Sequence, residues 1–402
     1  MRAIFVDKVL PRMLLVKTFS QAWPGICWSP LSSTTVADLP EPQLPGDRWI
    51  KVKNHQCGLC ATDLSLLYVN VDPAVGPAAL PGNQRFYLGH EVVSTVEAVG
   101  PGVTRFRLGD RVVMDSRFQG PTCLSQEISP PCRYCAAGDY GLCLNASANR
   151  GPRGVGGGWG DGYTAHESEV YPVPADITDD QAMLIEPMSV GLHAVLRRPP
   201  EDADRVLVVG CGVIGLLTLQ AARAVAPGCH ITAVARYPHQ AEAARRLGAN
   251  EVVSRPTYQD IAQITGAHYY AAPMNKGMLL GGFDRIYDCV GNANTLENNL
   301  RWAAGGGAVV MVGIDLARLT LDLNPIWYQE LDLVGSLAHG ADRWRGEHRH
   351  TYDWVIELMR AGKLSADGLI THRFRFEQYR QAVATTQDKK TARPIKVAFC
   401  YD

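Results

Sequence analysis

The chain has 402 residues, of which 46% are hydrophobic and 20% charged, and this suits a globular protein of two domains. Its formal net charge of −1 gives no electrostatic basis for binding nucleic acid or an anionic membrane. No apolar run is long enough to span a bilayer and the first residues lack a signal-peptide pattern, so we expect a cytoplasmic protein whose 11 cysteines stay reduced.

Short β-branched runs separated by glycine and proline turns fill the first 175 residues. Strands are predicted at residues 1–6, 49–53 and 91–99. Many short strands with frequent turns are typical of a barrel-like β domain, which we expect here.

From about residue 182 the pattern changes to strands that alternate with helices. Helices are predicted at 182–196, 215–225, 239–247 and 352–361, and strands at 205–209, 231–235, 251–253, 285–289 and 308–312. This alternation predicts a parallel, doubly wound sheet. Two further strand-like segments, 369–376 and 395–399, suggest that the end of the chain rejoins the first domain.

A glycine-rich turn follows the strand at 205–209 and opens the next helix. Gly210, Gly212 and Gly215 form the pattern G-x-G-x-x-G there, with Val213 and Ile214 inside it. These glycines permit a tight turn, close approach of the backbone to a pyrophosphate, and close helix–strand packing. Because the free N–H groups of the helix start also attract phosphates, the motif predicts a dinucleotide site rather than a plain turn.

The end of the next strand indicates which dinucleotide binds. An NAD site usually has an acidic residue there, which accepts hydrogen bonds from the ribose hydroxyls. This chain has Ala235 followed by Arg236, with His239 close behind. A guanidinium can pair with the 2′-phosphate of NADP, so the sequence favours NADP. The alternative is that Arg236 is a solvated surface arginine and the site accepts either cofactor.

Four cysteines gather in a turn-rich stretch, and clustered cysteines in a reducing compartment indicate metal binding. Cys132 and Cys135 are followed by Cys143, and Cys123 lies upstream. Thiolates at such spacing suit a closed, tetrahedral, structural zinc site. A regular spacing would need a cysteine where Ser129 stands, so Cys123 has to be the fourth ligand. The alternative is a group of reduced thiols without a metal.

A second set of metal-binding residue types is dispersed along the chain. It comprises Cys57 and Cys60, then His90, then Glu186. The pair C-x-x-C could be a redox pair, but no thioredoxin-like βαβ context surrounds it. A single histidine is more often structural, so only the conjunction of these residues points to a catalytic metal.

In order along the chain, these motifs resemble the medium-chain dehydrogenase/reductase superfamily, above all its zinc-containing polyol, threonine and glucose dehydrogenase branch. The markers are Cys-Gly-Leu-Cys-Ala-Thr-Asp at 57–63, Gly-His-Glu at 89–91, Gly-Asp-Arg-Val at 109–112, Ile-Glu-Pro-Met-Ser-Val-Gly-Leu-His-Ala at 185–194, Asp-Cys-Val-Gly at 288–291 and Ile-Thr-His-Arg-Phe at 370–374. The resemblance implies a GroES-like catalytic domain over 1–186 and 339–402, interrupted by a Rossmann domain over 187–338.

The resemblance also implies roles for individual residues. Cys60 and His90 are expected to be zinc ligands, and Glu91 a neighbouring or exchangeable ligand. Glu186 matches the position where the polyol branch has glutamate and liver-type alcohol dehydrogenases have a second cysteine. A Cys/His/Glu set makes a harder Lewis acid, suited to vicinal diols or amino alcohols. The expected cofactor-binding residues are Gly210, Gly212, Val213, Ile214, Gly215, Arg236, Val290 and Gly313.

The expected proton path departs from the liver-type pattern. In the family a hydroxyl two residues after the ligand cysteine passes on the proton, and here that residue is Thr62. Asp63 beside it is expected to orient the loop. The liver-type relay ends on a histidine where this chain has Ser65, so the relay has to end on a ribose hydroxyl, water, Glu91 or another histidine.

The implied reaction is reversible oxidation of a secondary alcohol of a polyol, sugar or amino alcohol, by a homodimer or homotetramer. Two alternatives compete with it: a zinc-free quinone or enoyl reductase of the same superfamily, and a non-catalytic cofactor-binding protein. Two segments look longer than the family pattern, 8–35 and 264–282. Each is expected to be a surface elaboration or subunit contact, or else a wall of the substrate cleft.

Overall fold

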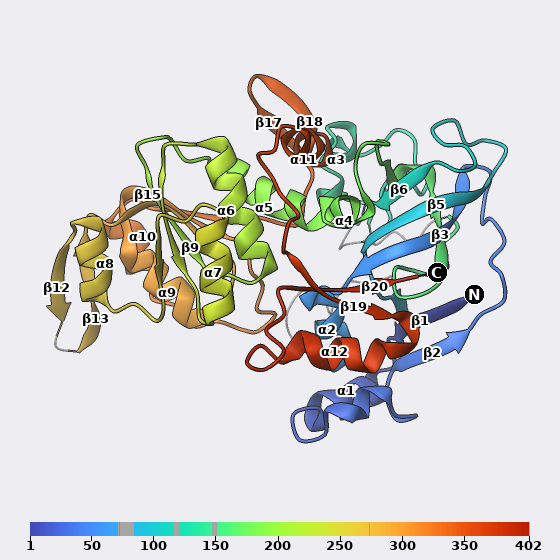
Figure 1. Ribbon diagram of the computed structural model, residues 1–402, viewed down its shortest axis with the longest axis horizontal. Coiled ribbons are helices and arrows are strands. Elements are labelled where there is room, and N and C mark those ends of the chain that lie inside the picture. The colour runs from blue at the N-terminus through green and yellow to red at the C-terminus, as the bar shows by residue number, and fades with distance from the viewer. Residues whose placement is uncertain (71, 73–83, 116–119, 147–150, 273, 402) are drawn as a thin grey trace. The chain divides into compact units, whose positions relative to one another are not determined.

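The structure is a computed structural model that describes residues 1–70, 72, 84–115, 120–146, 151–272 and 274–401. The chain divides into two compact units, the first made of residues 1–186 and 366–402 and the second of residues 187–365 (Figure 1). Among the described residues, no helix is both long and apolar enough to cross a bilayer.

The first unit is built on β-sheets. Its larger sheet has the strand order β19-β20-β3-β5-β6-β8, with β7 also paired to β3. These strands are β3 (Trp49–Gly58), β5 (Glu91–Val99), β6 (Arg111–Met114), β7 (Gly162–His166), β8 (Val170–Pro172), β19 (Ile370–Arg375) and β20 (Lys396–Cys400). A second sheet has the order β2-β1-β4, from β1 (Arg2–Asp7), β2 (Thr34–Asp38) and β4 (Arg85–Tyr87). Because β20 runs antiparallel to β3, with Phe399 opposite Cys57, the end of the chain lies beside the first cysteine motif.

Short helices complete the first unit. They are α1 (Leu10–Phe19), η1 (Pro24–Trp28), α2 (Ala61–Tyr68), α3 (Arg133–Ala136), η3 (Tyr140–Leu142), η4 (Glu167–Glu169), α4 (Asp179–Met183), η5 (Phe376–Gln378) and α12 (Tyr379–Gln387). The long first segment, 8–35, thus contains α1 and η1, and it leaves apolar side chains such as Leu10 and Trp23 exposed. Ile4, Ile50, Trp159 and Phe399 are among the residues that fill the core.

The second unit is a parallel sheet flanked by helices. Its order is β11-β10-β9-β14-β15-β16, and every pairing in it is parallel. The strands are β9 (Arg205–Val209), β10 (His230–Val234), β11 (Glu251–Val253), β14 (Phe283–Asp288), β15 (Ala303–Met311) and β16 (Asp332–Gly335). The helices are α5 (Ile185–Arg197), α6 (Val213–Val225), α7 (Pro238–Arg246), α8 (Tyr258–Thr265), α9 (Ala293–Trp302), α10 (Asn324–Tyr328) and α11 (Thr351–Arg360). This is the doubly wound sheet that the sequence predicts.

Two antiparallel hairpins are added to the second unit. One, β12 (His268–Ala272) with β13 (Asn275–Leu280), forms most of the predicted insertion at 264–282. The other is β17 (Ala341–Trp344) with β18 (Glu347–His350). Neither was predicted, because both lack the alternation of polar and apolar residues that marks a half-buried strand.

The helix predicted at 182–196 is wrong as a single element. A short helix, α4, begins at Asp179, where the side chain of Thr178 caps it, and ends before Leu184. The longer α5 then begins at Ile185. The cap at Thr178, rather than hydrophobic spacing, sets the start of α4.

Candidate functional site

The candidate catalytic residues gather at the start of α2. Cys60 is the residue before this helix, and Asp63 lies in its first turn with only 1% of its surface exposed. The Asp63 carboxylate accepts hydrogen bonds from the backbone N–H groups of Cys60 (3.1 Å) and Gly89 (2.9 Å). One buried carboxylate therefore fixes both the loop that carries Cys60 and the loop that carries His90.

Three donor groups converge there. The Cys60 sulfur, a His90 ring nitrogen and a Glu91 carboxylate oxygen all lie within 4.8 Å of one another. Thiolate, imidazole and carboxylate are the ligand types of zinc, and one ion about 2.0–2.3 Å from each donor fits such a group. The Thr62 hydroxyl lies 3.6 Å from the Cys60 sulfur. The residues present therefore fit a zinc ion.

Glu186 lies outside this group of three among the described side chains. It is buried, with 6% of its surface exposed, and it begins α5. Its charge contributes to raising the pKa of Lys396, which places it in the electrostatic surroundings of the group.

A buried lysine that the sequence did not reveal also belongs to this site. Lys396, at the start of β20, forms an ion pair with Glu91 and donates a hydrogen bond to the carbonyl oxygen of Leu59 at 3.1 Å. Burial acts to lower the pKa of Lys396, but the charges of Glu91 and Cys60 outweigh it and the pKa is raised. A Cβ at Gly58 would collide with both charged side chains, so the pair requires glycine there.

Cys57 is unsuited to the redox pairing considered for the C-x-x-C motif. Its thiol is completely buried and donates to the carbonyl oxygen of Gly58. Burial raises the pKa of Cys57 well above its ordinary value, with the charges of Asp63 and Glu91 adding to the effect. A thiol that stays protonated is a poor nucleophile in disulfide exchange.

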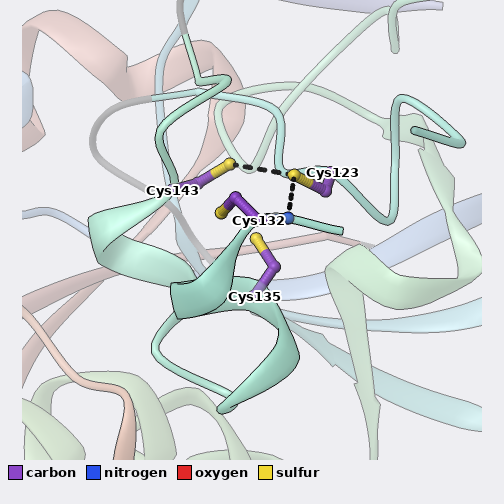
Figure 2. Close-up of side chains that lie close together, drawn as sticks. All are labelled: Cys123, Cys132, Cys135 and Cys143. Atoms are coloured by element: carbon purple, nitrogen blue, oxygen red, sulfur yellow. Dashed lines mark hydrogen bonds between the residues drawn. The ribbon is translucent and has the colours of Figure 1, made fainter. Parts of the chain in front are cut away.

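The second cysteine group is closed and local. Figure 2 shows Cys123, Cys132, Cys135 and Cys143 turned toward one another from two short helices and their loops. Their sulfurs all lie within 4.8 Å, and those of Cys123 and Cys143 are 3.7 Å apart. Sulfurs about 2.3 Å from one tetrahedral ion are about 3.8 Å apart, so the four fit zinc.

The thiols of this group differ in their electrostatics. A hydrogen bond from the backbone of Cys135 lowers the pKa of Cys132 to about 6. Burial raises the pKa values of Cys135 and Cys143. The buried positions therefore favour neutral thiols unless a cation compensates their charge.

The glycine turn of the second unit has the geometry that the motif requires. Gly210 adopts a left-handed φ of 90°, and Gly212 is the residue before α6. A Cβ at Gly215 would collide with the carbonyl oxygen of Gly210, so only glycine allows this packing. Val213 and Ile214 form the first turn of α6, whose N–H groups are free to bind a phosphate.

The other predicted cofactor residues lie at the same edge of the sheet. The Asp288 carboxylate, at the end of β14, accepts the N–H groups of Val290 and Gly291, each at 2.9 Å. The backbone N–H of Gly313, after β15, donates to the Asp288 carbonyl oxygen at 2.8 Å. A Cβ at Gly210 would touch the side chain of Val290. The ends of β9, β14 and β15 are thereby held together around a glycine-lined surface.

Arg236 follows the end of β10 and is exposed. Ala235 before it is buried, with 2% of its surface exposed, and brings no carboxylate. The Arg236 guanidinium lies 5.6 Å from the ring centre of Tyr237, and this ring stacks on His239 at 5.8 Å.

Comparison with protein-family models gives two matches. Residues 46–175 match the alcohol dehydrogenase GroES-like domain, and residues 213–359 match the zinc-binding dehydrogenase domain. One match lies within each unit.

Curated relatives and solved structures agree. The chain is 28% identical to L-idonate 5-dehydrogenase of Vitis vinifera, over 87% of each chain, and 28% identical to a sorbitol dehydrogenase of Arabidopsis thaliana, over 88% of this chain and 89% of that one. Among solved structures, 2R,3R-butanediol dehydrogenase of Bacillus subtilis superposes with a TM-score of 0.71 at 23% identity, over 92% of this chain and 96% of that chain. Galactitol-1-phosphate dehydrogenase of Escherichia coli gives a TM-score of 0.72 at 24% identity over 100% of both chains. The structural matches bear on the fold alone.

Proposed function

Because the chain belongs to the zinc-containing medium-chain alcohol and polyol dehydrogenases, which act on CH–OH groups, we propose that it is a zinc-dependent, NADP-preferring dehydrogenase of a polyol, sugar or amino alcohol. The convergence of Cys60, His90 and Glu91 at one point is the observation that carries the proposal. It also weighs against a zinc-free reductase, which has no use for such a ligand set.

In this proposal Cys60 and His90 hold the catalytic zinc, with Glu91 and Glu186 as the acidic ligands. Bound zinc supplies Lewis acidity, which makes a substrate hydroxyl easier to deprotonate. Asp63 keeps the two ligand loops in register through its bonds to Cys60 and Gly89. Lys396 holds Glu91 and offsets part of the negative charge gathered around the site.

Thr62 is the proposed first acceptor of the proton. Its hydroxyl lies beside the ligand sulfur, and a hydroxyl can accept one proton while it passes on another. Since Ser65 replaces the liver-type histidine, we propose that the proton leaves through water or a ribose hydroxyl. A bound nicotinamide cofactor would supply the hydride acceptor for oxidation of the carbinol to a ketone.

The cofactor is proposed to bind at the glycine turn of the second unit. Gly210, Gly212 and Gly215 admit the pyrophosphate, and the N-terminus of α6 supplies N–H donors. Arg236 is the proposed partner of the 2′-phosphate, and the preference for NADP over NAD rests on it and on the absence of an acidic residue at Ala235.

The four-cysteine group is proposed to be a structural zinc site. Four thiolates complete a tetrahedral ion and leave no open position for a substrate. None of the 11 cysteines forms a disulfide, and a reducing, cytoplasmic compartment is proposed. Like many enzymes of this kind, the protein is proposed to be a homodimer or homotetramer.

One screen tests the proposed function. The purified protein is assayed with NADP and with NAD against polyols, aldoses, amino alcohols and simple secondary alcohols, and its zinc content is measured alongside. We expect two zinc ions per chain and turnover with NADP on a vicinal diol or amino alcohol. Turnover without zinc at the Cys60 group, or binding of cofactor without turnover on any substrate, would refute the proposal.

A further inference from the structure

Two arginines follow adjacent strands at one edge of the second unit. In the parallel pair β10–β11, Val234 lies opposite Val253. The backbone N–H of Ala235 still donates to the carbonyl oxygen of Val253, at 2.9 Å. The ladder therefore runs to the ends of both strands, and Arg236 and Arg255 each come two residues after this last pair. Arg236 and Arg255 thus follow neighbouring strand ends at one edge of the sheet.

The backbone holds Arg255 in an unusual conformation. Its φ is 52°, in the left-handed region, which a long side chain adopts only at a cost and which Gly or Asn adopts more easily. Directly after it, Thr257 and Asp260 close a capping box at the start of α8. The turn is thus fixed from its far side, and an arginine is present where the conformation itself does not favour one.

Among the described residues, neither guanidinium is held by an ion pair or a hydrogen bond, although that of Arg236 lies 5.6 Å from the centre of the Tyr237 ring. Two other arginines of this unit do form such bonds. Arg223 donates to the carbonyl oxygens of Cys229 and Gly248, and Arg301 pairs with Asp322. Arg236 and Arg255 are both exposed. Two such cations on one sheet edge repel each other until an anion lies between them.

We propose that Arg255 is a second 2′-phosphate-binding residue, which acts with Arg236 to grip the phosphomonoester of NADP. The inference rests on the proposed preference for NADP and names a residue from a different strand for the same ligand group. Two guanidinium forks match a phosphate carrying close to two negative charges, which neither arginine alone would neutralise. A dinucleotide with a free 2′-hydroxyl gains nothing from Arg255.

The test uses nucleotide fragments, so it does not depend on zinc or on the substrate. Binding of adenosine 2′,5′-bisphosphate and of 5′-AMP to the full-length protein is measured by calorimetry. Arg255→Asn removes the charge with a residue that tolerates the left-handed backbone. We expect this variant to bind the bisphosphate roughly tenfold more weakly, the effect of one lost charged hydrogen bond, and to bind 5′-AMP with unchanged affinity. Arg245→Gln, an exposed arginine at the end of α7, is the matched control and should change neither.

Three outcomes separate this inference from the proposed function. If the wild type prefers the bisphosphate and Arg255→Asn keeps that preference, the role of Arg255 is refuted and the NADP preference stands. If the wild type binds both fragments equally, the NADP preference is wrong and the role of Arg255 falls with it. If Arg255→Asn weakens both fragments equally, the residue is structural. Arg255→Lys keeps the charge but lacks the forked guanidinium, so we expect it to retain part of the preference for the bisphosphate. This variant replaces Arg255→Asn in the test if the latter does not fold.

Discussion

The first unit contains two groups of side chains that could each hold a metal ion, and they are built in opposite ways. The four-cysteine group takes identical ligands from one stretch, 123–143, with little regular structure around it. The group of Cys60, His90 and Glu91 takes three different ligands and is surrounded by buried charges, Asp63 and Lys396. Uniform thiolates close a site, whereas mixed donors supported by other charged groups leave room for chemistry.

The largest expected effect is on turnover, from Cys60→Ser. Loss of this ligand should reduce kcat/KM by at least roughly 1000-fold, because the metal that activates the hydroxyl is no longer held. Serine is a good helix N-cap, so α2 should persist and NADP binding should be unchanged. Steady-state kinetics and cofactor titration measure the two quantities. Cys400→Ser, on β20 and outside both groups, is the control, and near-normal turnover by Cys60→Ser would contradict the assignment.

Cys135→Ser should have the reverse profile. Losing one of four structural ligands should lower the free energy of unfolding by roughly 3–5 kcal/mol, because the binding free energy of such a metal is part of the folding free energy. The folded fraction should keep its kcat. Chemical denaturation and zinc analysis check this, with Cys27→Ser, a buried cysteine outside both groups, as the control. A variant of normal stability that lacks only turnover would show that the comparison between the two groups is wrong.

Lys396→Met examines the charged surroundings of the mixed site. It removes the lysine that pairs with the buried Glu91 carboxylate, which should cost about 3 kcal/mol. If the ion pair with Glu91 is the reason, adding Glu91→Gln to Lys396→Met should recover part of the lost stability, since the carboxylate that needed the lysine is gone. Denaturation of both single variants and the double variant gives the coupling. Simple additivity would count against a paired role, and Lys53→Met, at an exposed position of β3, should be silent.

The sequence predicted the local features better than the assembled ones. The strands at 205–209 and 251–253 were predicted with the observed bounds, because short valine-rich runs between polar or glycine turns have few alternatives. The motifs also placed Cys60, His90 and the four cysteines in groups that the structure brings together.

Lys396 shows why the rest could not be predicted. It lies 337 residues from Leu59, whose carbonyl oxygen it bonds, and a lysine in a strand-like segment is ordinarily a surface residue. Only the pairing of β20 with β3 brings it to Glu91. Likewise, the hairpins at 268–280 and 341–350 depend on pairings that no local periodicity records.

The smallest expected effect is on stability and concerns Glu167. This buried carboxylate, unlike Glu91, lies outside both cysteine-containing groups. Glu167, fully buried, accepts N–H groups of Thr104 and Arg105 at 3.0 Å and pairs with Arg48. Burial acts to raise the pKa of Glu167, but these hydrogen bonds and Arg48 outweigh it and the pKa is lowered below 4.5. A lowered pKa means that the carboxylate stabilises the fold above pH 4.5 and that this contribution is lost as the pH falls through the folded-state value.

Glu167→Gln should therefore cost about 2 kcal/mol near pH 7, and its difference from the wild type should shrink toward pH 3. Denaturation curves at several pH values measure this difference. Glu97→Gln, in an exposed pair with Lys51, should change stability by no more than about 0.5 kcal/mol at any pH. If the cost of Glu167→Gln stayed constant down to pH 3, the charge of Glu167 would not be what stabilises the fold. The contrast between Glu167, whose charge stabilises the fold, and Glu91, whose charge belongs to the candidate catalytic group, would then be wrong.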